Sequence, residues 1–336
     1  MKKVNFEVDF VVLWVDGSDS EWIKSFNSFL PSELSNKKID TSEKRYRDNG
    51  LLKYWFRGVE KYAPWVRKIH FVTCGQKPDW LNTNNPKLHL VNHSDYIDSK
   101  YLPLFNSSAI EISMHKIPDL AEHFVYFNDD FFLTSEVSQE YFFSPSGNIK
   151  DFATFTNISN TAFDHLLLNN ESLIESFINK RDVIKKNLGK WFNIHYSIKE
   201  IIKNLFYFRK TNGTFISFNH FPQAYRKDFF STVWELKKSE LEQTLAKRFR
   251  SYEDYTHYIF REYALLNGFF EPVSSSNSKK YFDITDDIET IQKSIRNKKY
   301  KIIVINDQDC CDYDKRIDLI RRSFDSILPE KSQFEL

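Results

Sequence analysis

Five short apolar runs, each of which stops at a polar or acidic side chain, constrain the fold of this chain most. They are FVVLWV before Asp16, KIHFVTCG before Gln76, KLHLV before Asn92, HFVYF before Asn128 and KIIVI before Asn306. Short, continuous apolar runs are typical of strands buried on both faces of a mostly parallel sheet. Segments with helical spacing lie between the runs, at 49–62 and 107–116. The alternation predicts an α/β, Rossmann-like fold, with a mostly parallel central sheet flanked by helices and ligands at the carboxyl ends of the strands.

One internal segment, 151–214, follows a different pattern. It contains SLIESFINKRDVIKKNLGKWFNIHYSIKEIIKNLFYF, which has helical spacing and many basic and aromatic side chains. We therefore expect residues 1–150 and 215–336 to form the α/β core and residues 151–214 to form a helical insertion. The insertion could pack on the sheet, and its Lys, Trp, Phe and Tyr content would also suit a membrane interface. A second helical stretch is expected at 231–267.

Composition excludes several classes of protein. Lys and Arg total 47 and Asp and Glu total 46 of 336 residues, so the net charge near zero argues against a nucleic-acid partner. Three cysteines, Cys74, Cys310 and Cys311, provide neither a disulfide framework nor zinc-site spacing, which favours a reducing cytoplasm. Because no apolar stretch approaches about 18 residues, we expect a cytoplasmic protein that is at most peripheral on the inner face of the cytoplasmic membrane.

The adjacent carboxylates Asp129 and Asp130 interrupt apolar sequence in EHFVYFNDDFFLTSE. Consecutive side chains on a strand point to opposite faces, but where the strand ends the chain turns and both can reach one ligand. Carboxylate oxygens suit Mg²⁺ or Mn²⁺, and these cations in turn suit a diphosphate. The alternative is a solvated turn or a helix N-cap, although a carboxylate beside apolar residues costs free energy if it is buried without a partner.

Two further groups of polar residues precede predicted helices. In WVDGSD, Asp16 and Asp19 form a second acidic cluster. Asp16 could accept a hydrogen bond from a ribose or base while Gly17 allows close backbone approach; alternatively, the motif is an ordinary turn in which Asp19 caps a helix. In RYRDNG, Arg45 and Arg47 could hold phosphate, or they could be ordinary surface charge. Both groups could therefore contact a nucleotide.

Four other ionisable positions are candidates for the same site. His220 lies in a loop fixed by Pro222 and could move a proton near neutral pH. Arg250 could bind phosphate, and Glu111 and His115, four residues apart on a helix, could face one site or pair with each other. Each could equally be structural. Neither a Walker loop nor a Gly-x-Gly-x-x-Gly fingerprint occurs, so a phosphate site here would depend on acids, a cation and arginines.

The order of these motifs resembles the four conserved regions of the Stealth family of sugar-1-phosphate transferases. The matching blocks are FVVLWVDGSD; KRYRDNGLLKYWFRGVEKYAPWVRKIHFVTCGQKPDWL with LPLFNSSAIEISMHKIPDLAEHFVYFNDDFFL; NHFPQAYRKDFF with RFRSYEDYTHY; and IIVINDQD followed by SQFEL. The resemblance runs nearly end to end and leaves only the helical insertion uncovered. The family comprises bacterial capsular polysaccharide phosphotransferases and is similar to the catalytic part of the animal N-acetylglucosamine-1-phosphotransferase alpha/beta subunit.

The resemblance implies transfer of a hexose-1-phosphate, expected to be an N-acetylhexosamine-1-phosphate, from a UDP-sugar to an acceptor sugar hydroxyl. UMP would be released, and a phosphodiester would form in a capsular polysaccharide or exopolysaccharide. The implied partners are a nucleotide-sugar donor and a saccharide or polysaccharide acceptor, and the implied cofactor is Mg²⁺ or Mn²⁺. The helical insertion could then be a lid over the acceptor.

Carried over position by position, the resemblance implies three sets of site residues. The catalytic residues would be Asp130 or His220 as the general base and Arg250 as the group that stabilises the transferring phosphoryl group. The metal ligands would be Asp129, Asn306 and Asp307. The donor- or substrate-binding residues would be Asp16, Gly17, Asp19, Arg45, Arg47, Asp48, Asn49, Asn106, Ser107, Glu111, His115, Asn128 and Arg226.

Two other functions are compatible with the same motifs. In a metal-dependent glycosyltransferase the acceptor would attack the anomeric carbon and form a glycosidic bond. An inactive scaffold for capsule assembly would use none of the acids in chemistry.

Asp309, Asp312 and Asp314 follow the fourth region and could form a structural Ca²⁺ site, although the full EF-hand pattern is not met.

Overall fold

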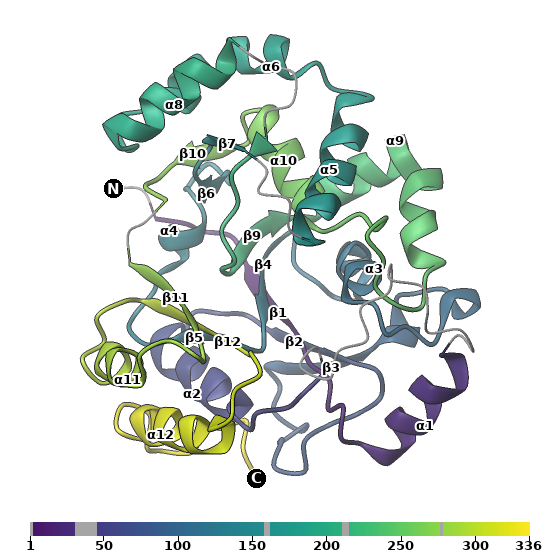
Figure 1. The fold of residues 1–336 in the computed structure, drawn as a ribbon, viewed down its shortest axis with the longest axis vertical. Helices are drawn as coiled ribbons and strands as arrows, with labels where there is room; N and C mark the ends of the chain where they lie inside the picture. The colour runs from purple at the N-terminus through teal and green to yellow at the C-terminus, as the bar shows by residue number, and fades with distance from the viewer. Residues whose placement is uncertain (1–2, 31–45, 158–161, 210–214, 276–277) are drawn as a thin grey trace.

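The central sheet has five strands, in the order β3-β2-β1-β4-β9, in a computed structural model that describes residues 3–30, 46–157, 162–209, 215–275 and 278–336. β1 (Val8–Leu13), β2 (Ile69–Thr73), β3 (Leu88–Asn92) and β4 (His123–Asn128) run parallel, and β9 (Gln223–Arg226) is antiparallel to β4. The remaining strands are β5 (Phe131–Leu133), β6 (Ile149–Asp151), β7 (Phe155–Thr156), β8 (Phe215–Ile216), β10 (Phe270–Pro272), β11 (Lys279–Asp283) and β12 (Ile302–Asn306). The parallel-rich sheet confirms the α/β fold expected from the apolar runs (Figure 1).

Helices surround this sheet (Figure 1). The longer ones are α1 (Ser20–Phe29), α2 (Leu52–Tyr62), α5 (Ala162–Glu175), α8 (Ile198–Phe208), α9 (Lys227–Leu245), α10 (Tyr258–Leu266), α11 (Ile288–Arg296) and α12 (Tyr313–Asp325). The shorter ones are α3 (Ser107–Glu111), α4 (Gln139–Phe142), α6 (Lys180–Lys186) and α7 (Leu188–Trp191). The helix expected at 107–116 stops at Glu111, and a separate 3₁₀ turn, Met114–Lys116, follows it. The stretch at 231–267 forms parts of two helices, α9 and α10.

The central strands are mostly apolar because helices cover both faces of the sheet. On one face, α2 places Trp55 with its ring centroid 5.5 Å from that of Phe127 in β4. On the other face, α9 places Phe230 with its ring centroid 5.7 Å from that of Phe124. The two phenylalanines are three positions apart on one strand, and an odd spacing sends side chains to opposite faces.

The chain passes from the central sheet into a second sheet at Asp129 and Asp130. β4 ends at Asn128, and β5 then joins a three-stranded sheet with the order β11-β12-β5. β12 is antiparallel to β5, and the Ile305 N–H donates to the carbonyl oxygen of Asp130 at 3.1 Å. The run KIIVI therefore belongs to this second sheet, and its polar end lies beside the end of β4.

The described part of the expected insertion contains β7 and helices α5 to α8. β7 pairs with β8, and β6, where the segment begins, pairs with β10. Asp151 is buried there and accepts hydrogen bonds from Arg261 Nε at 2.7 Å and Nη2 at 3.0 Å, which ties the segment to α10. Figure 1 places α6 and α8 at the end of the molecule opposite α12. The segment is largely helical, while the domain division itself stays a prediction.

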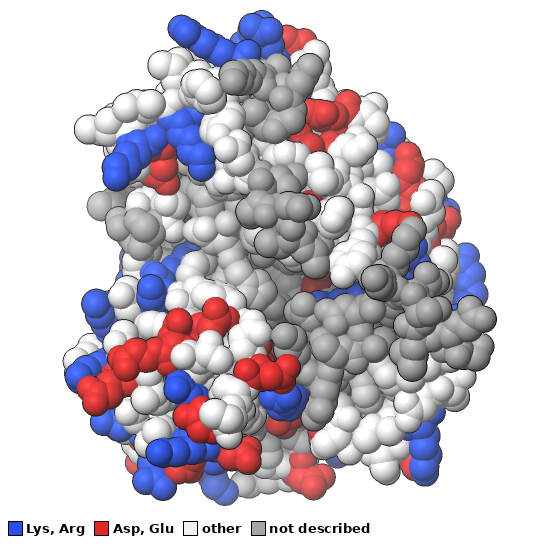
Figure 2. All heavy atoms as spheres, viewed as in Figure 1, with Lys and Arg blue, Asp and Glu red and all other residues white. Residues whose placement is uncertain are grey.

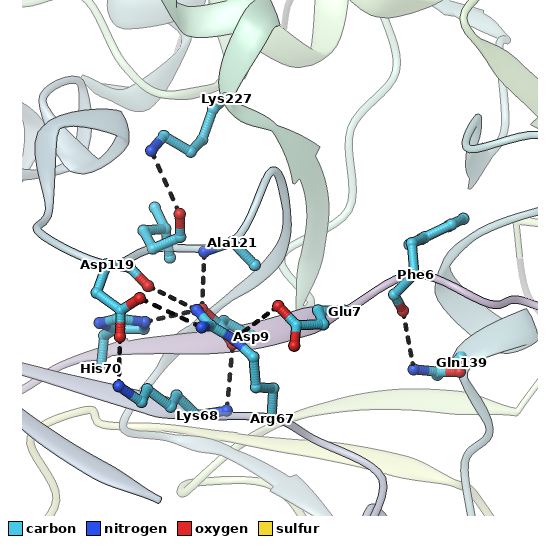
Figure 3. Close-up of polar contacts among 11 residues, drawn as sticks. Phe6, Glu7, Asp9, Arg67, Lys68, His70, Asp119, Ala121, Gln139 and Lys227 are labelled. Atoms are coloured by element: carbon cyan, nitrogen blue, oxygen red, sulfur yellow. Dashed lines mark hydrogen bonds and ion pairs between the residues drawn. The ribbon is translucent and has the colours of Figure 1, made fainter.

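Asp9 is a fully buried carboxylate near the start of β1, at the edge of the sheet opposite the strands' carboxyl ends (Figure 3). It accepts hydrogen bonds from Arg67 Nε at 2.9 Å and from the backbone N–H groups of Lys68 and Ala121 at 3.1 and 2.8 Å. His70 Nε2 lies 2.9 Å from its Oδ2. Burial alone would raise the pKa of Asp9, but the bonds from His70 and Arg67 lower it below its usual range. This charged cluster joins β1, β2 and the chain before β4.

Candidate active site

A cavity of about 590 Å³ lies at the carboxyl ends of β1, β2 and β4, beside the end of β12. Many of the polar residues predicted from the sequence line it. They are Arg47, Asn49, Ser107, Glu111, Asn128, Asp129, Asp130, His220, Arg250, Asn306 and Asp307. The fold thus brings together side chains that the sequence keeps far apart, at the edge where an α/β sheet binds its ligands.

Asp129 and Asp130 are half-buried in this cavity, where the two sheets meet. Loss of surrounding water raises the pKa of Asp129 to about 7, and repulsion from Asp48 and Asp307 adds to the shift. The pKa of Asp130 is well above its usual range because of the same loss of water and the charge of Asp129. Within the described residues, Asp130 Oδ1 is buried and has no hydrogen-bond partner. A cation in the cavity would offset the cost of holding these carboxylates together.

Asp307 is held by side chains from other segments. Arg47 Nη1 donates to Asp307 Oδ1 at 3.2 Å, and Tyr313 Oη donates to Asp307 Oδ2 at 3.2 Å. Arg47 Nη2 donates to Asp309 Oδ1 at 3.0 Å, and its guanidinium carbon lies 4.5 Å from the centroid of the Tyr313 ring. Asp309, considered from the sequence as part of a calcium loop, is engaged in this ion pair. Arg47 therefore anchors the segment after β12 at the cavity.

Arg250 reaches the cavity from the loop 247–254, which Asn106 holds in place. Asn106 Nδ2 donates to Asp254 Oδ2 at 2.9 Å and to two backbone carbonyl oxygens of the loop at 3.2 and 3.3 Å. Its Oδ1 accepts from the second N–H of α3 at 3.1 Å and so caps that helix. Arg250 Nη2 in turn donates to Ser107 Oγ. Asn106 is buried beneath the cavity lining, so its contribution is to position Arg250 and Ser107.

A buried polar network lies along one wall of the cavity. Tyr126 Oη lies 3.0 Å from Glu111 Oε1 and 2.6 Å from Asn128 Oδ1. Glu111 Oε2 lies 3.8 Å from His257 Nε2, and His257 Nδ1 lies 2.6 Å from Tyr225 Oη. Loss of water raises the pKa of Tyr126 and lowers the pKa of His257, so both are neutral at ordinary pH. The network fixes the orientation of Glu111 and Asn128 at the cavity surface.

His220 faces the cavity from the loop between β8 and β9. Its ring centroid is 4.9 Å from that of Phe131, with the rings at 86°, and 6.0 Å from that of Tyr281. Phe131 directly follows Asp130 in the chain. His220 and Asp130 therefore enter the cavity near the same point of the second sheet, one from a loop and one from a strand end.

The WVDGSD motif makes local contacts at the rim of the cavity. Asp16 Oδ1 accepts from the N–H of Ser18 at 2.8 Å and from its hydroxyl at 2.6 Å. Asp19 caps α1, the alternative considered from the sequence. A Cβ on Gly17 would lie 2.6 Å from the carbonyl oxygen of Tyr46, so this glycine allows two backbone segments to approach closely. Asp16, Gly17 and Asp19 do not line the cavity, and their part in donor binding stays a prediction.

Four other predicted residues have no described place in the cavity lining. Asp48, between Arg47 and Asn49, accepts a hydrogen bond from the Gly50 N–H at 3.0 Å. Arg226 lies beside the start of β4, at the opposite edge of the sheet, and pairs with Asp228. His115 packs against aromatic rings of α9, and burial lowers its pKa to about 3. Since α3 ends before it, His115 does not share a helix face with Glu111, which does line the cavity. Arg45 lies outside the described residues.

Two groups of aromatic rings in the cavity wall were not predicted. They are Trp22, Tyr46 and Phe105 in one group and Phe163, Phe218 and Tyr258 in the other. The ring centroid of Phe218 lies 5.1 Å from that of Phe163 and 5.0 Å from that of Tyr258. With 32 Phe, 17 Tyr and 7 Trp in the chain, no single ring stands out in the sequence. The place of Tyr126 at the cavity could have been predicted from the sequence, because it is two residues before Asn128 and its side chain therefore points to the same face of the strand.

Asp129, Asn306 and Asp307 offer the oxygen atoms that Mg²⁺ prefers. Asn306 Nδ2 donates to Asp283 Oδ1 at 2.7 Å, which fixes the plane of its amide. Within the described ranges, no three His, Cys, Asp or Glu side chains are grouped so that they could hold a metal ion. Mg²⁺ is usually held by one or two carboxylates, with phosphate and water in the other positions. The donor set and the unpartnered oxygen of Asp130 fit a cation shared with a diphosphate better than a closed protein site.

Comparison with known proteins gives a consistent relationship. Models of Stealth conserved regions 1 and 2 match residues 6–32 and 45–151. The chain is 38% identical to the capsular polysaccharide phosphotransferase WcwK of Streptococcus pneumoniae, over 98% of each chain. It is 38% identical to the exopolysaccharide phosphotransferase cps2G of Lactiplantibacillus plantarum, over 98% of this chain and 96% of that protein. It is 37% identical to the receptor polysaccharide phosphotransferase WefC of Streptococcus gordonii, over 98% of this chain and 99% of that protein.

These three relatives form one class, the bacterial polysaccharide phosphotransferases, and each matches this chain nearly from end to end. The chain belongs to the Stealth family, which confirms the resemblance carried by its motifs. A solved structure of the galactosyltransferase LgtC covers 94% of this chain with a TM-score of 0.37 and 9% identity, a distant likeness.

Proposed function

We propose that this protein transfers a hexose-1-phosphate, of the N-acetylhexosamine class, from a UDP-sugar to a hydroxyl of an acceptor saccharide. UMP is released, and the product is a phosphodiester of a capsular polysaccharide or exopolysaccharide. The observation that carries the proposal is the convergence of Asp129, Asp130, His220 and Arg250 in one cavity. The relatives, which are capsular and exopolysaccharide phosphotransferases, support the reaction class and a saccharide partner.

In this reaction the acceptor hydroxyl attacks the phosphorus that carries the sugar. A new O–P bond forms to the acceptor, the O–P bond to the phosphate of UMP breaks, and the hydroxyl proton passes to a base of the protein. The bond between the sugar and its phosphate is untouched, so the anomeric configuration is retained. The protein must hold acceptor and diphosphate in line and stabilise the charge that grows on the bridging oxygen.

The positions of the two arginines suggest different roles for them. Arg250 donates to the Ser107 hydroxyl, and a guanidinium held in this way can present its other N–H groups to a phosphoryl group. We assign it to stabilisation of the transferring phosphoryl group. Arg47 uses its donors on Asp307 and Asp309, and we assign it to holding the Asp307 segment at the cavity.

Asp130 is the preferred base and His220 the competing one. Asp130 Oδ1 has no hydrogen-bond partner among the described residues, so this oxygen has lone pairs with which to accept the proton of a hydroxyl. The carboxylate must be ionised to act, and the positive charge of a bound cation would favour the ionised form. His220 enters the same cavity and has the intrinsic pKa range of a proton acceptor.

Mg²⁺ or Mn²⁺, held by Asp129 and Asp307 with the amide oxygen of Asn306, would neutralise the diphosphate and the leaving UMP when bound. All three residues line the cavity. Treatment with EDTA should abolish UMP release, and added Mg²⁺ should restore it. Full activity in EDTA would remove the metal from the proposal.

The second aromatic group offers the acceptor a binding surface. Phe163, Phe218 and Tyr258 present aromatic ring area in the cavity wall, and sugars bury their apolar ring faces against such surfaces. Phe163 comes from α5, so the helical insertion contributes to the cavity, in agreement with a lid over the acceptor.

A panel of UDP-sugars incubated with Mg²⁺, with the released nucleotides separated by chromatography, tests the proposal. Release of UMP with at least one donor is the expected result. Release of UDP instead would favour a metal-dependent glycosyltransferase. Failure to bind any nucleotide-sugar in the presence of Mg²⁺ would favour the inactive capsule-assembly scaffold.

A further inference from the structure

Helix α8 is attached to the rest of the molecule by one face. Asn204 on that face is fully buried; its Oδ1 accepts from the Phe155 N–H at 2.9 Å, and its Nδ2 donates to two backbone carbonyl oxygens at 2.9 and 2.6 Å. A capping box begins the helix: Ser197 Oγ accepts from the Glu200 N–H at 3.3 Å, and Glu200 Oε2 accepts from the Ser197 N–H at 2.7 Å. These contacts fix which side of α8 faces outward.

The outward side of α8 and the turn before it are apolar. Ile194 is 91% exposed, Ile198 77%, Ile202 61%, Leu205 50% and Phe206 54%. From Ile198 onward these residues recur at helical spacing, so they form one continuous face. Contiguous exposed apolar surface of this kind marks an interaction site in a soluble domain. No helix in the described ranges is long and apolar enough to cross a membrane.

Cations flank this apolar face. The exposed or half-exposed basic side chains of α6 and α8 and their ends are Arg181, Lys185, Lys186, Lys199, Lys203 and Arg209. The acids in the same stretch are Asp182 and Glu200. Glu200 is engaged in the capping box and accepts from Ser275 Oγ at 2.6 Å. Figure 2 shows uncharged atoms over α8, with Lys and Arg atoms on both sides of it.

We propose that α8 docks on the surface of a bilayer that contains anionic lipids, with Ile198, Ile202 and Phe206 entering the boundary between headgroups and acyl chains. Basic amphipathic helices bind such surfaces through apolar burial and through attraction of Lys and Arg to anionic headgroups. A second copy of the chain fits less well, because a two-fold contact would set these cations against themselves. Because α5 of the same insertion lines the cavity, docking through α8 would tether the protein by the segment that also contributes to its site.

Co-sedimentation with vesicles tests the proposal, using vesicles of phosphatidylcholine alone and of phosphatidylcholine mixed with phosphatidylglycerol. The protein should bind the mixed vesicles, and added salt should weaken binding. The variant Ile198→Ser/Ile202→Ser/Phe206→Ser should bind at least about tenfold more weakly, because three apolar side chains no longer enter the lipid. Lys199→Glu/Lys203→Glu should also weaken binding. Leu236→Ser is the matched control, because Leu236 on α9 is 54% exposed, and it should bind like the wild type.

Any of four results would overturn the proposal. Three come from the vesicles: failure to bind the mixed vesicles, equal binding to both vesicle types, and wild-type binding by the triple variant. The fourth is a dimer, seen by sedimentation equilibrium without vesicles, that the triple variant abolishes; this would make a second copy the occupant of the face. Circular dichroism and urea unfolding of each variant show that it is folded, and the vesicle result does not depend on the proposed reaction.

Discussion

At the scale of single residues, like charges are kept together where two sheets meet. The Ile305 N–H pairs with the carbonyl oxygen of Asp130 at 3.1 Å, which fixes the backbone beside Asp129. Loss of water raises the pKa values of both carboxyl groups. Repulsion from Asp48 and Asp307 adds to the shift of Asp129, and the charge of Asp129 adds to the shift of Asp130. The sequence indicated this pair because charge interrupts apolar residues there. It gave no indication of the ion pair between Arg47 and Asp307, which are 260 positions apart.

Asp130→Ala and His220→Ala distinguish the two candidate bases. Loss of a general base should lower UMP release by about 10²- to 10⁴-fold. Circular dichroism and urea unfolding should show that both variants are folded. Asp228→Ala is the matched control, because this carboxylate pairs with Arg226 away from the cavity, and it should retain activity. A near-normal rate in either cavity variant would remove that residue from the mechanism.

At the scale of elements, the loop that carries Arg250 depends on one buried amide. Asn106→Ala removes the donor to Asp254 and the cap of α3, and we expect the free energy of unfolding to fall by about 2–4 kcal/mol. UMP release should fall toward the level of Arg250→Ala. Both quantities can be measured on the same preparation, by urea unfolding and by nucleotide chromatography.

Asn106→Ser separates the two contributions of this residue. Serine is a good N-cap but cannot reach the loop, so the variant should recover part of the stability and little of the activity. Wild-type activity in Asn106→Ser would show that the loop does not need the amide, and Asn106 would then be only a helix cap.

The buried cluster at the other edge of the sheet makes a prediction for stability alone. Arg67→Met leaves Asp9 as a buried carboxylate without its main cationic partner, and we expect unfolding free energy to fall by about 3 kcal/mol or more. Lys293→Met, which removes an exposed pair with Glu289 one turn away on α11, is the comparison and should cost much less. Equal losses in urea unfolding would contradict the account of Asp9.

Most of the strands that the sequence predicted are buried along nearly their whole length. β1, β2 and β4 are buried on both faces, so their continuous apolar runs are visible without any knowledge of their neighbours. The position of β12 in a second sheet could not be predicted from the sequence, because its partner β5 has only three residues and shows no strand pattern of its own. The early end of α3 could not be predicted from the sequence either. The indole N–H of Trp234 donates to the carbonyl oxygen of Ile112 at 2.7 Å, and a continuous helix would use that oxygen for its own backbone hydrogen bond.

At the scale of the whole molecule, buried histidines make stability depend on pH. Burial lowers the pKa of His93 to about 4, so the folded chain binds fewer protons than the unfolded chain below pH 6.5. The stability that His93 contributes is therefore lost as pH falls from 6.5 toward 4, by about 2 kcal/mol at pH 5.

His93→Gln isolates this contribution, because other titrating groups cancel in the comparison. The difference in unfolding free energy between wild type and variant should shift by about 2 kcal/mol between pH 7 and pH 5, in favour of the variant. Urea unfolding at the two pH values gives this difference. A difference that does not change with pH would show that His93 is protonated as easily in the folded chain as in the unfolded chain.

The cavity itself is a property of the whole fold. Motif spacing placed most of its polar residues in one group, because strands that run parallel end at one edge. The aromatic walls and the positioning contacts of Asn106 arise from segments that approach only after folding, so local pattern does not contain them. Arg226 illustrates the same limit, because β9 runs antiparallel and carries it to the opposite edge.

The fate of the donor's second phosphate tests the central claim most directly. The UDP-sugar that gives turnover, labelled with ³²P in the β-phosphate, is incubated with the protein and Mg²⁺, with water or a saccharide as acceptor. The account predicts unlabelled UMP, with the label bound to the sugar as hexose-1-phosphate or as a phosphodiester. Label recovered in UDP, with an unlabelled saccharide product, would show that the anomeric bond is broken and would contradict the account.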